Sequence, residues 1–252
     1  MLTRFLVGLF TGALALGAQE SPVGASDPLQ DLLGTPLTVA SRKAMALRSS
    51  PGIVTLITRE EILDSGARDL LDVLGRVPGF YPGFDVTGVV GVGVRGAWAY
   101  EGKLLFLLDG MELNESLYGN LPLLNHLPLA TIKRIEIVRG PGSVVYGGFA
   151  ELAVVNIITL DGSDLKGQAG VRGTLSRMGQ DVGRSNLEFG LGDTSSLGTW
   201  SLGAYLGRAL ESDQVYTDPN LNQVDLGEEQ HTRNIHVNAG FRQGGTHVRL
   251  LV

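Results

Sequence analysis

The sequence predicts an α+β domain, a small mixed sheet of about four to five strands with short helices, followed by antiparallel strands of an incomplete transmembrane β-barrel. Residues 53–159 mix strand-sized apolar runs with one helical segment, whereas the residues after 162 alternate strictly between apolar and polar side chains. The chain also has 36 glycines among 252 residues, well above the usual share of ~7%. These three observations favour strands and turns over a helical protein.

The composition excludes several classes of protein. The chain has no cysteine, which excludes a disulfide scaffold, thiolate metal sites and a cysteine nucleophile. Its net charge of −6 argues against nucleic acid as a partner. Only 18% of the residues are charged, so we do not expect a disordered chain.

The first residues have the pattern of a secretory signal peptide. Arg4 is the only charge before Glu20, residues 5–16 are almost entirely apolar, and the small residues Gly17 and Ala18 follow. The apolar run is shorter than the ~20 residues that a transmembrane helix needs. We therefore expect residues 1–18 to be a signal peptide that exports the protein; a retained membrane anchor is the alternative.

Residues 19–50 form an arm rich in Ser, Pro, Gly and Asp with little periodicity, which is typical of a flexible linker. The arm contains one β-capable segment, made of Thr35, Pro36, Leu37, Thr38 and Val39.

The α+β domain is expected over residues 51–162. Its first strand, residues 53–57, leads into a capping box at Thr58 and Glu61 and a helical segment over 60–74 that is interrupted at Gly66. Asp109 and Gly110 predict a turn. Further strands are expected at 89–95, 103–108, 135–138 and 152–159, and long connections at 80–88 and 111–129.

Residues 163–252 are expected to form about five barrel strands. On the fourth of them, Ile235, Val237 and Phe241 alternate with polar or charged residues, which suits a wall with lipid outside and water or protein inside. A soluble sandwich gives the same alternation. The connections at 192–197 and 243–245 are short, and those at 176–185 and 208–231 are longer, which favours a barrel with short periplasmic turns and long outer loops.

The number of strands is too small for a closed barrel. At ~10 residues per strand, the residues after 162 supply about five strands, whereas the smallest barrels of this type have about eight. Open strand edges leave amides that lipid cannot satisfy. We therefore expect the chain to be the N-terminal part of a longer protein.

The α+β domain resembles the plug domain of TonB-dependent outer-membrane receptors over about 120 residues. The matching segments lie in order along the chain, at 41–43, 52–62, 65–67, 72–74, 77–79, 94–96, 105–110, 135–143, 146–147 and 154–159. The strands after 162 would then be the first strands of the barrel that surrounds the plug.

The resemblance implies an outer-membrane receptor for a scarce nutrient, such as a ferric siderophore or cobalamin. The expected partners are the outer-membrane lipid, an extracellular small-molecule ligand such as a metal chelate, and the periplasmic protein TonB, which adds a strand of the arm to its own sheet. Thr35, Pro36, Leu37, Thr38 and Val39 are the candidate TonB contact, with an ordinary linker as the alternative.

The resemblance also implies charged contacts that hold the plug in the barrel. Arg95 and Arg139 each end a plug strand and precede a glycine, and we favour ion pairing with barrel glutamates over solvated strand ends for Arg139. Glu136 in the plug and Glu188, on the polar face of a barrel strand, are the acidic candidates.

Ligand and metal sites are less sharply indicated. Phe80, Tyr81, Tyr118 and Asn120 lie in the long plug connections and are candidate ligand contacts, although packing explains them nearly as well. The calcium candidates are Asp213, Asp218 and Asp225; their irregular spacing favours a solvated outer loop, so no metal site is predicted.

The sequence does not predict an enzyme or a cofactor. A sequence pattern like that of dinucleotide-binding sites is present at Gly91, Gly93 and Gly96. Such a site needs a helix after the glycines, whereas another strand is expected here. The four histidines lack the spacing of a zinc protease, and no nucleophile elbow is present. The alternative function is a non-transporting periplasmic or outer-membrane binding or signalling module with a plug-like domain.

Overall fold

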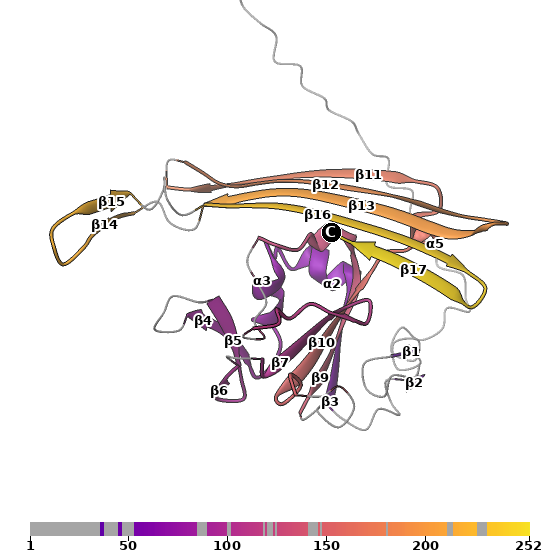
Figure 1. The fold of residues 1–252 in the computed structure, drawn as a ribbon, viewed down its shortest axis with the longest axis horizontal. Helices are drawn as coiled ribbons and strands as arrows, with labels where there is room; N and C mark the ends of the chain where they lie inside the picture. The colour runs from indigo at the N-terminus through magenta and orange to yellow at the C-terminus, as the bar shows by residue number, and fades with distance from the viewer. Residues whose placement is uncertain are drawn as a thin grey trace, which may run out of the picture.

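The computed structural model describes residues 36–37, 45–46, 53–84, 90–99, 102–117, 119, 123, 125–140, 146, 148–179, 181–210, 214–225 and 231–252. Figure 1 shows an α+β unit lying beneath a long, curved antiparallel sheet.

The central sheet of the α+β unit is mixed. Strand β10 is parallel to β7 and antiparallel to β9, and the order across the sheet is β3-β9-β10-β7-β8. This confirms the predicted small mixed sheet. The strands are β3 (Ile53–Thr58), β7 (Leu104–Leu108), β8 (Met111–Glu112), β9 (Ile132–Arg139) and β10 (Ala153–Thr159).

Two short helices, α2 (Arg59–Asp64) and α3 (Leu70–Leu74), stand where one interrupted helix was expected. The capping box is present: the Glu61 amide donates to Thr58 Oγ1 at 3.2 Å, and the Thr58 amide donates to the Glu61 carboxylate at 2.7 Å. The chain leaves α2 through Gly66, whose φ of +70° suits glycine. A 3₁₀ turn, η2 (Leu129–Thr131), and helix α5 (Gly162–Leu165) follow later. In the described part of the chain, no helix is both long and apolar enough to cross a membrane.

Strand β7 is buried on both faces, which explains its uninterrupted apolar sequence. Leu104 and Phe106 point into the main core, which also contains residues of α2 and α3. Leu105 and Leu107 point the other way, into a smaller cluster around Val154. The predicted turn at its end is formed by Asp109 and Gly110, with φ values of 50° and 86°. Positive φ at both central residues is the geometry for which an Asp-Gly pair is favoured in a hairpin.

A second, three-stranded sheet contains β4 (Phe80–Phe84), β5 (Val90–Val94) and β6 (Ala97–Trp98). The expectation that residues 80–88 form only a connection was therefore wrong for β4, which pairs antiparallel with β5. Pro82 is tolerated because β4 is an edge strand, where a missing amide breaks no ladder on the outer side.

The C-terminal sheet consists of β11 (Ala169–Met178), β12 (Asp181–Ser195), β13 (Gly198–Leu210), β16 (His231–Gln243) and β17 (Thr246–Leu251). They pair in this order, each antiparallel to its neighbour. The five described strands form an open sheet that extends over α2 and α5 (Figure 1).

The predicted alternation divides this sheet into an apolar outer face and a polar inner face. Leu187 pairs with Leu206, which pairs with Ile235, and these outer side chains are 48%, 50% and 74% exposed. One residue further along, Glu188 pairs with Tyr205, and both are buried toward the α+β unit. The sheet therefore buries its polar face and exposes its apolar one, as a lipid-facing wall does.

The connections in this sheet differ in part from the prediction. Residues 196–197 and 244–245 form short turns, and residues 211–230 are the longest link, which contains the hairpin β14 (Val215–Thr217) and β15 (Gln223–Asp225). The link over 176–185 was wrongly expected to be long. Strands β11 and β12 continue to Met178 and Asp181, because their pairing persists beyond a bulge at Ser176.

Candidate functional site

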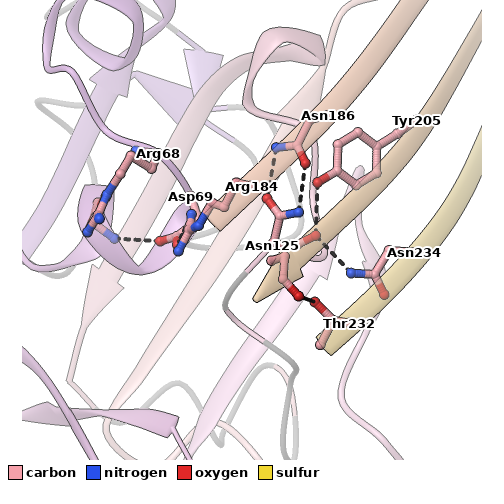
Figure 2. Close-up of polar contacts among 10 residues, drawn as sticks. Arg68, Asp69, Asn125, Arg184, Asn186, Tyr205, Thr232 and Asn234 are labelled. Carbon is pink, nitrogen blue, oxygen red and sulfur yellow. Dashed lines mark hydrogen bonds and ion pairs between the residues drawn. The ribbon is translucent and has the colours of Figure 1, made fainter. Parts of the chain in front are cut away.

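The site is the interface between the α+β unit and the inner face of the C-terminal sheet. Asn125, in the long connection after β8, is 1% exposed and contacts three strands of that sheet. Its side-chain amide exchanges hydrogen bonds of 2.7 and 2.8 Å with Asn186 on β12. Its backbone carbonyl accepts from Tyr205 Oη on β13 and from Asn234 Nδ2 on β16, each at 2.9 Å. Figure 2 shows Asn125 between these side chains, so one residue fixes the connection against three strands.

A buried ion pair lies beside this cluster (Figure 2). Arg184 on β12 places Nη1 2.7 Å from Oδ2 of Asp69, and the side chains are 16% and 2% exposed. Asp69 is fixed in place because it also caps α3, accepting from the Asp72 amide at 3.0 Å. Breaking a buried pair by removing one partner leaves an uncompensated charge, which is strongly destabilising.

Two further arginines of the sheet reach acidic residues of the α+β unit. Arg249 on β17 contacts the Asp109 carboxylate and donates to Thr159 Oγ1 at 3.0 Å. Asp109 in turn accepts from the amide and hydroxyl of Thr159 at 2.9 and 2.8 Å. Arg242 on β16 donates to Asp161, the N-cap of α5, at 2.8 Å.

The segment η2 is held from both sides. Glu188 on β12 accepts from the Ala130 amide at 3.1 Å. From α2, Arg59 Nη1 donates to the carbonyls of Ala130 and Ile132 at 2.6 and 2.8 Å. Burial lowers the pKa of the Arg59 guanidinium below its ordinary value. A guanidinium is nevertheless protonated at neutral pH, so both bonds are charge-assisted.

In the three ion pairs described above, the arginines lie on the sheet and face aspartates on the α+β unit. The pairing of plug arginines with barrel glutamates stays a prediction. The sequence did contain a signal for the three ion pairs, because the apolar–polar alternation of the strands predicts which side chains face inward. The three arginines on the polar, inward face are Arg184, Arg242 and Arg249.

The four residues expected to form ion pairs lie elsewhere or pair differently. Arg95 is exposed at a turn, with its amide donating to Gly79 O at 2.8 Å. Arg139 donates to the Pro78 carbonyl at 2.8 Å, within the α+β unit. Glu136 is fully buried and pairs at 2.8 Å with Arg134 of the same strand, because both point to one face of β9. Glu188 does face the α+β unit, but its hydrogen bond is to the Ala130 amide.

The two described candidate ligand contacts, Phe80 and Tyr81, lie in different environments. Phe80 is 6% exposed and packs in the main core, so it was wrongly taken as a ligand contact. Tyr81, on the opposite face of β4, is 41% exposed, and its ring lies 6.5 Å from that of Trp98, which sequence reasoning missed. Tyr118 and Asn120 lie outside the described residues.

Two residues of the candidate TonB contact are described. Pro36 and Leu37 form strand β1, which pairs antiparallel with β2 (Met45–Ala46). Thr35, Thr38 and Val39 lie outside the described residues. The backbone of Pro36 and Leu37 is thus extended, and the TonB contact stays a prediction.

Two of the three aspartates considered as calcium ligands, Asp218 and Asp225, lie in the β14–β15 hairpin. Asp218 accepts hydrogen bonds of 2.8 Å from the amides of Asn220 and Asn222, which closes the turn of the β14–β15 hairpin. Asp225 pairs with Val215 across the same hairpin, and Asp213 lies outside the described residues. Across the described ranges, no group of three or more metal-ligating side chains is assembled.

The site is thus a small α+β domain fixed by polar contacts to the inner face of an antiparallel sheet whose outer face is apolar. Residues 46–154 match the sequence model of the TonB-dependent Receptor Plug Domain. A vitamin B12 transporter, BtuB, from Vibrio vulnificus (strain CMCP6) is 34% identical over 171 residues, which cover 66% of this chain and 26% of that protein.

Solved structures share the fold. The ferric yersiniabactin uptake receptor FyuA from Yersinia pestis superposes with a TM-score of 0.52 at 16% identity, over 75% of this chain and 28% of that one. The siderophore receptor PirA from Acinetobacter baumannii gives 0.54 at 19% identity, over 79% and 30%. Residues 46–154 thus match a TonB-dependent receptor plug domain, and the chain shares the fold of these solved receptors. The chain spans about a quarter of the length of the curated relative.

Proposed function

We propose that this protein is an outer-membrane receptor that imports a scarce nutrient chelate, cobalamin or a ferric siderophore, with energy supplied through TonB. The observation that carries the proposal is the plug domain seated on the polar inner face of a sheet whose outer face is apolar. The relatives are a vitamin B12 transporter and siderophore receptors, which are transport proteins and not enzymes.

The location in the outer membrane is supported by the sheet itself. Residues such as Leu187, Leu206 and Ile235 expose an apolar surface that lipid would cover. The predicted signal peptide, residues 1–18, would export the chain to that compartment.

The two ends of the sheet suggest the direction of transport. The longest strand connection, with β14 and β15, lies toward the same end as the sheet of β4, β5 and β6 that carries Tyr81 (Figure 1). The short turns at 196–197 and 244–245 lie toward the other end, where β1 and β2 are found. Ligand capture near Tyr81 and energy input at the arm would thus act from opposite sides of the membrane.

Uptake measurements in cells test the proposal. The gene is expressed in a strain without its own cobalamin and siderophore receptors, and uptake of radiolabelled cyanocobalamin and of ferric enterobactin is followed with and without a protonophore. We expect saturable surface binding of one probe under both conditions and accumulation only with the proton gradient intact. Accumulation that is insensitive to the protonophore, or binding of neither probe, would contradict the proposal.

A further inference from the structure

The outer face of the C-terminal sheet carries exposed arginines at one end. They are Arg177 on β11, Arg208 on β13 and Arg233 on β16. Each lies two residues from an exposed apolar residue of the outer face, so the alternation of a strand places it on that face as well. Each also lies within two residues of the end of its strand, and that end is opposite the short turns at 196–197 and 244–245 (Figure 1). Positive charge on the outer face is therefore gathered at the end that bears the long link over 211–230.

Two of these arginines lie directly opposite each other. Arg208 pairs with Arg233 on one side and with Ser185 of β12 on the other. The Cβ atoms of directly opposed residues are ~4.5–5.5 Å apart, and like charges in that position destabilise a sheet. None of the ion pairs in the described part of the chain includes Arg177, Arg208 or Arg233. An anion placed between Arg208 and Arg233 would remove their repulsion.

The surface next to this arginine pair is apolar. Leu206 precedes Arg208 by two residues on β13, and Ile235 follows Arg233 by two residues on β16. These two apolar residues pair with each other and are 50% and 74% exposed. An anion held by the arginines would therefore lie at the border of a surface that acyl chains can cover. A free phosphate ion would leave that surface uncovered, whereas the phosphate of a lipid would bring its own acyl chains.

The arginine pair lies at the height expected of a lipid headgroup. Near the other end of the sheet, Trp200 pairs with Phe241 on the same outer face. Aromatic side chains commonly mark the border of the apolar band of a barrel, which is ~25 Å tall. The eight residues from Trp200 to Arg208 span ~27 Å along β13, or ~20 Å in height at a strand tilt of ~40°. Arg208 therefore lies near the opposite border of the band and not at mid-membrane.

We propose that Arg208 and Arg233 together bind a phosphate group of an anionic membrane lipid, in the leaflet at the long-link end of the sheet. A guanidinium forms bidentate, charge-assisted hydrogen bonds with phosphate, and its apolar stem can lie along an apolar surface. Arg177, two strands from Arg208 and thus about 10 Å away, adds a second contact with the same leaflet. The inference rests on the outer-membrane location in the proposed function and does not require transport.

Lipid binding by the purified protein tests the proposal. The protein in detergent is titrated with diphosphoryl lipid A, a glycolipid with phosphomonoester groups, and bound lipid is counted by native mass spectrometry. We expect the double variant Arg208→Gln with Arg233→Gln to bind the lipid about tenfold more weakly, because both charge-assisted contacts are lost. Arg68→Gln removes an exposed arginine from the plug and is the control, with lipid binding unchanged. Equal binding by the wild type and the double variant would overturn the proposal.

Two measurements on the wild-type protein make the test independent of how the variants fold. Lipid A from which the phosphates have been removed should bind about tenfold more weakly than the diphosphoryl form. Equal binding of the two forms would overturn the phosphate contact. Inorganic phosphate at the concentration of the lipid should not displace it; displacement would show a site for free anions and overturn the lipid assignment. None of these measurements involves uptake, so their failure is distinguishable from a failure of the proposed transport function.

Discussion

Arg184→Ala is expected to destabilise the docking of the plug by about 3–5 kcal/mol, which is the cost of leaving a buried charge without its partner. The carboxylate of Asp69 is 2% exposed and cannot turn to solvent, because it caps α3 at the same time. Urea unfolding of the purified protein, followed by protease cleavage within the plug, measures the change. The midpoint should fall markedly, and cleavage should begin at lower urea than in the wild type.

The neighbouring pair provides a matched control. Arg68 and Asp72 are 2.8 Å apart, close to the 2.7 Å of the buried pair, but the Arg68 side chain is 64% exposed, so Arg68→Ala should cost less than about 1 kcal/mol. The Arg68 guanidinium beside Asp72 holds the pKa of that carboxyl below its ordinary value. The small stabilisation is therefore present at neutral pH and is lost only as the pH falls through the lowered pKa.

A second substitution distinguishes the cost of an unpaired buried charge from the cost of lost packing. Asp69→Asn added to Arg184→Ala removes the charge and keeps an oxygen to cap α3. The double variant should therefore recover part of the free energy of unfolding that Arg184→Ala loses. Equal, small effects of Arg184→Ala and Arg68→Ala would show that the buried pair does not hold the plug in place.

Deletion of residues 35–39 is expected to abolish uptake and to leave ligand binding at the cell surface intact. The segment contains Pro36 and Leu37, whose extended backbone pairs with only two residues of β2. So short a pairing is readily exchanged for a longer one with a partner strand, and strand addition relies mainly on backbone hydrogen bonds. Uptake and binding of the same labelled probe in the same cells give the two readouts.

A length-matched replacement controls for shortening of the arm. Replacing residues 35–39 with glycine and serine keeps the reach of the arm but weakens its strand propensity, and should also reduce uptake. Undiminished uptake in both variants would show that residues 35–39 are an ordinary linker and not the proposed TonB contact.

Local signals in the sequence were sufficient for much of the fold. The capping box at Thr58 and Glu61 and the hairpin turn at Asp109 and Gly110 depend on residues close in sequence, and both formed as predicted. The alternation in the C-terminal sheet was equally clear, because a strand exposes alternate residues to opposite faces. Strand β4 was missed because its Pro and Gly are typical of connections.

The interface depends on tertiary contacts that no local pattern encodes. Asn125 lies 61 residues from Asn186 and 109 from Asn234, and nothing around it distinguishes it from other loop asparagines. The arginines were identifiable as inward-facing once the strands were placed, but their partners were not. Asp69, for example, has the sequence pattern of a helix cap, and its second role depends on the position of Arg184 on β12.

Cross-linking in intact outer membranes tests most directly whether the plug lies against the polar face of the sheet. The double variant Asn125→Cys with Asn186→Cys places two thiols where the amides now exchange hydrogen bonds of 2.7 and 2.8 Å. The backbone carbonyl of residue 125 keeps its bonds to Tyr205 and Asn234, so the connection stays in place. The control pairs Asn125→Cys with Leu187→Cys, one residue along the strand and on the apolar face. A short bifunctional thiol reagent should join 125 to 186 and not to 187; joining to 187 alone, or to neither, would contradict this arrangement.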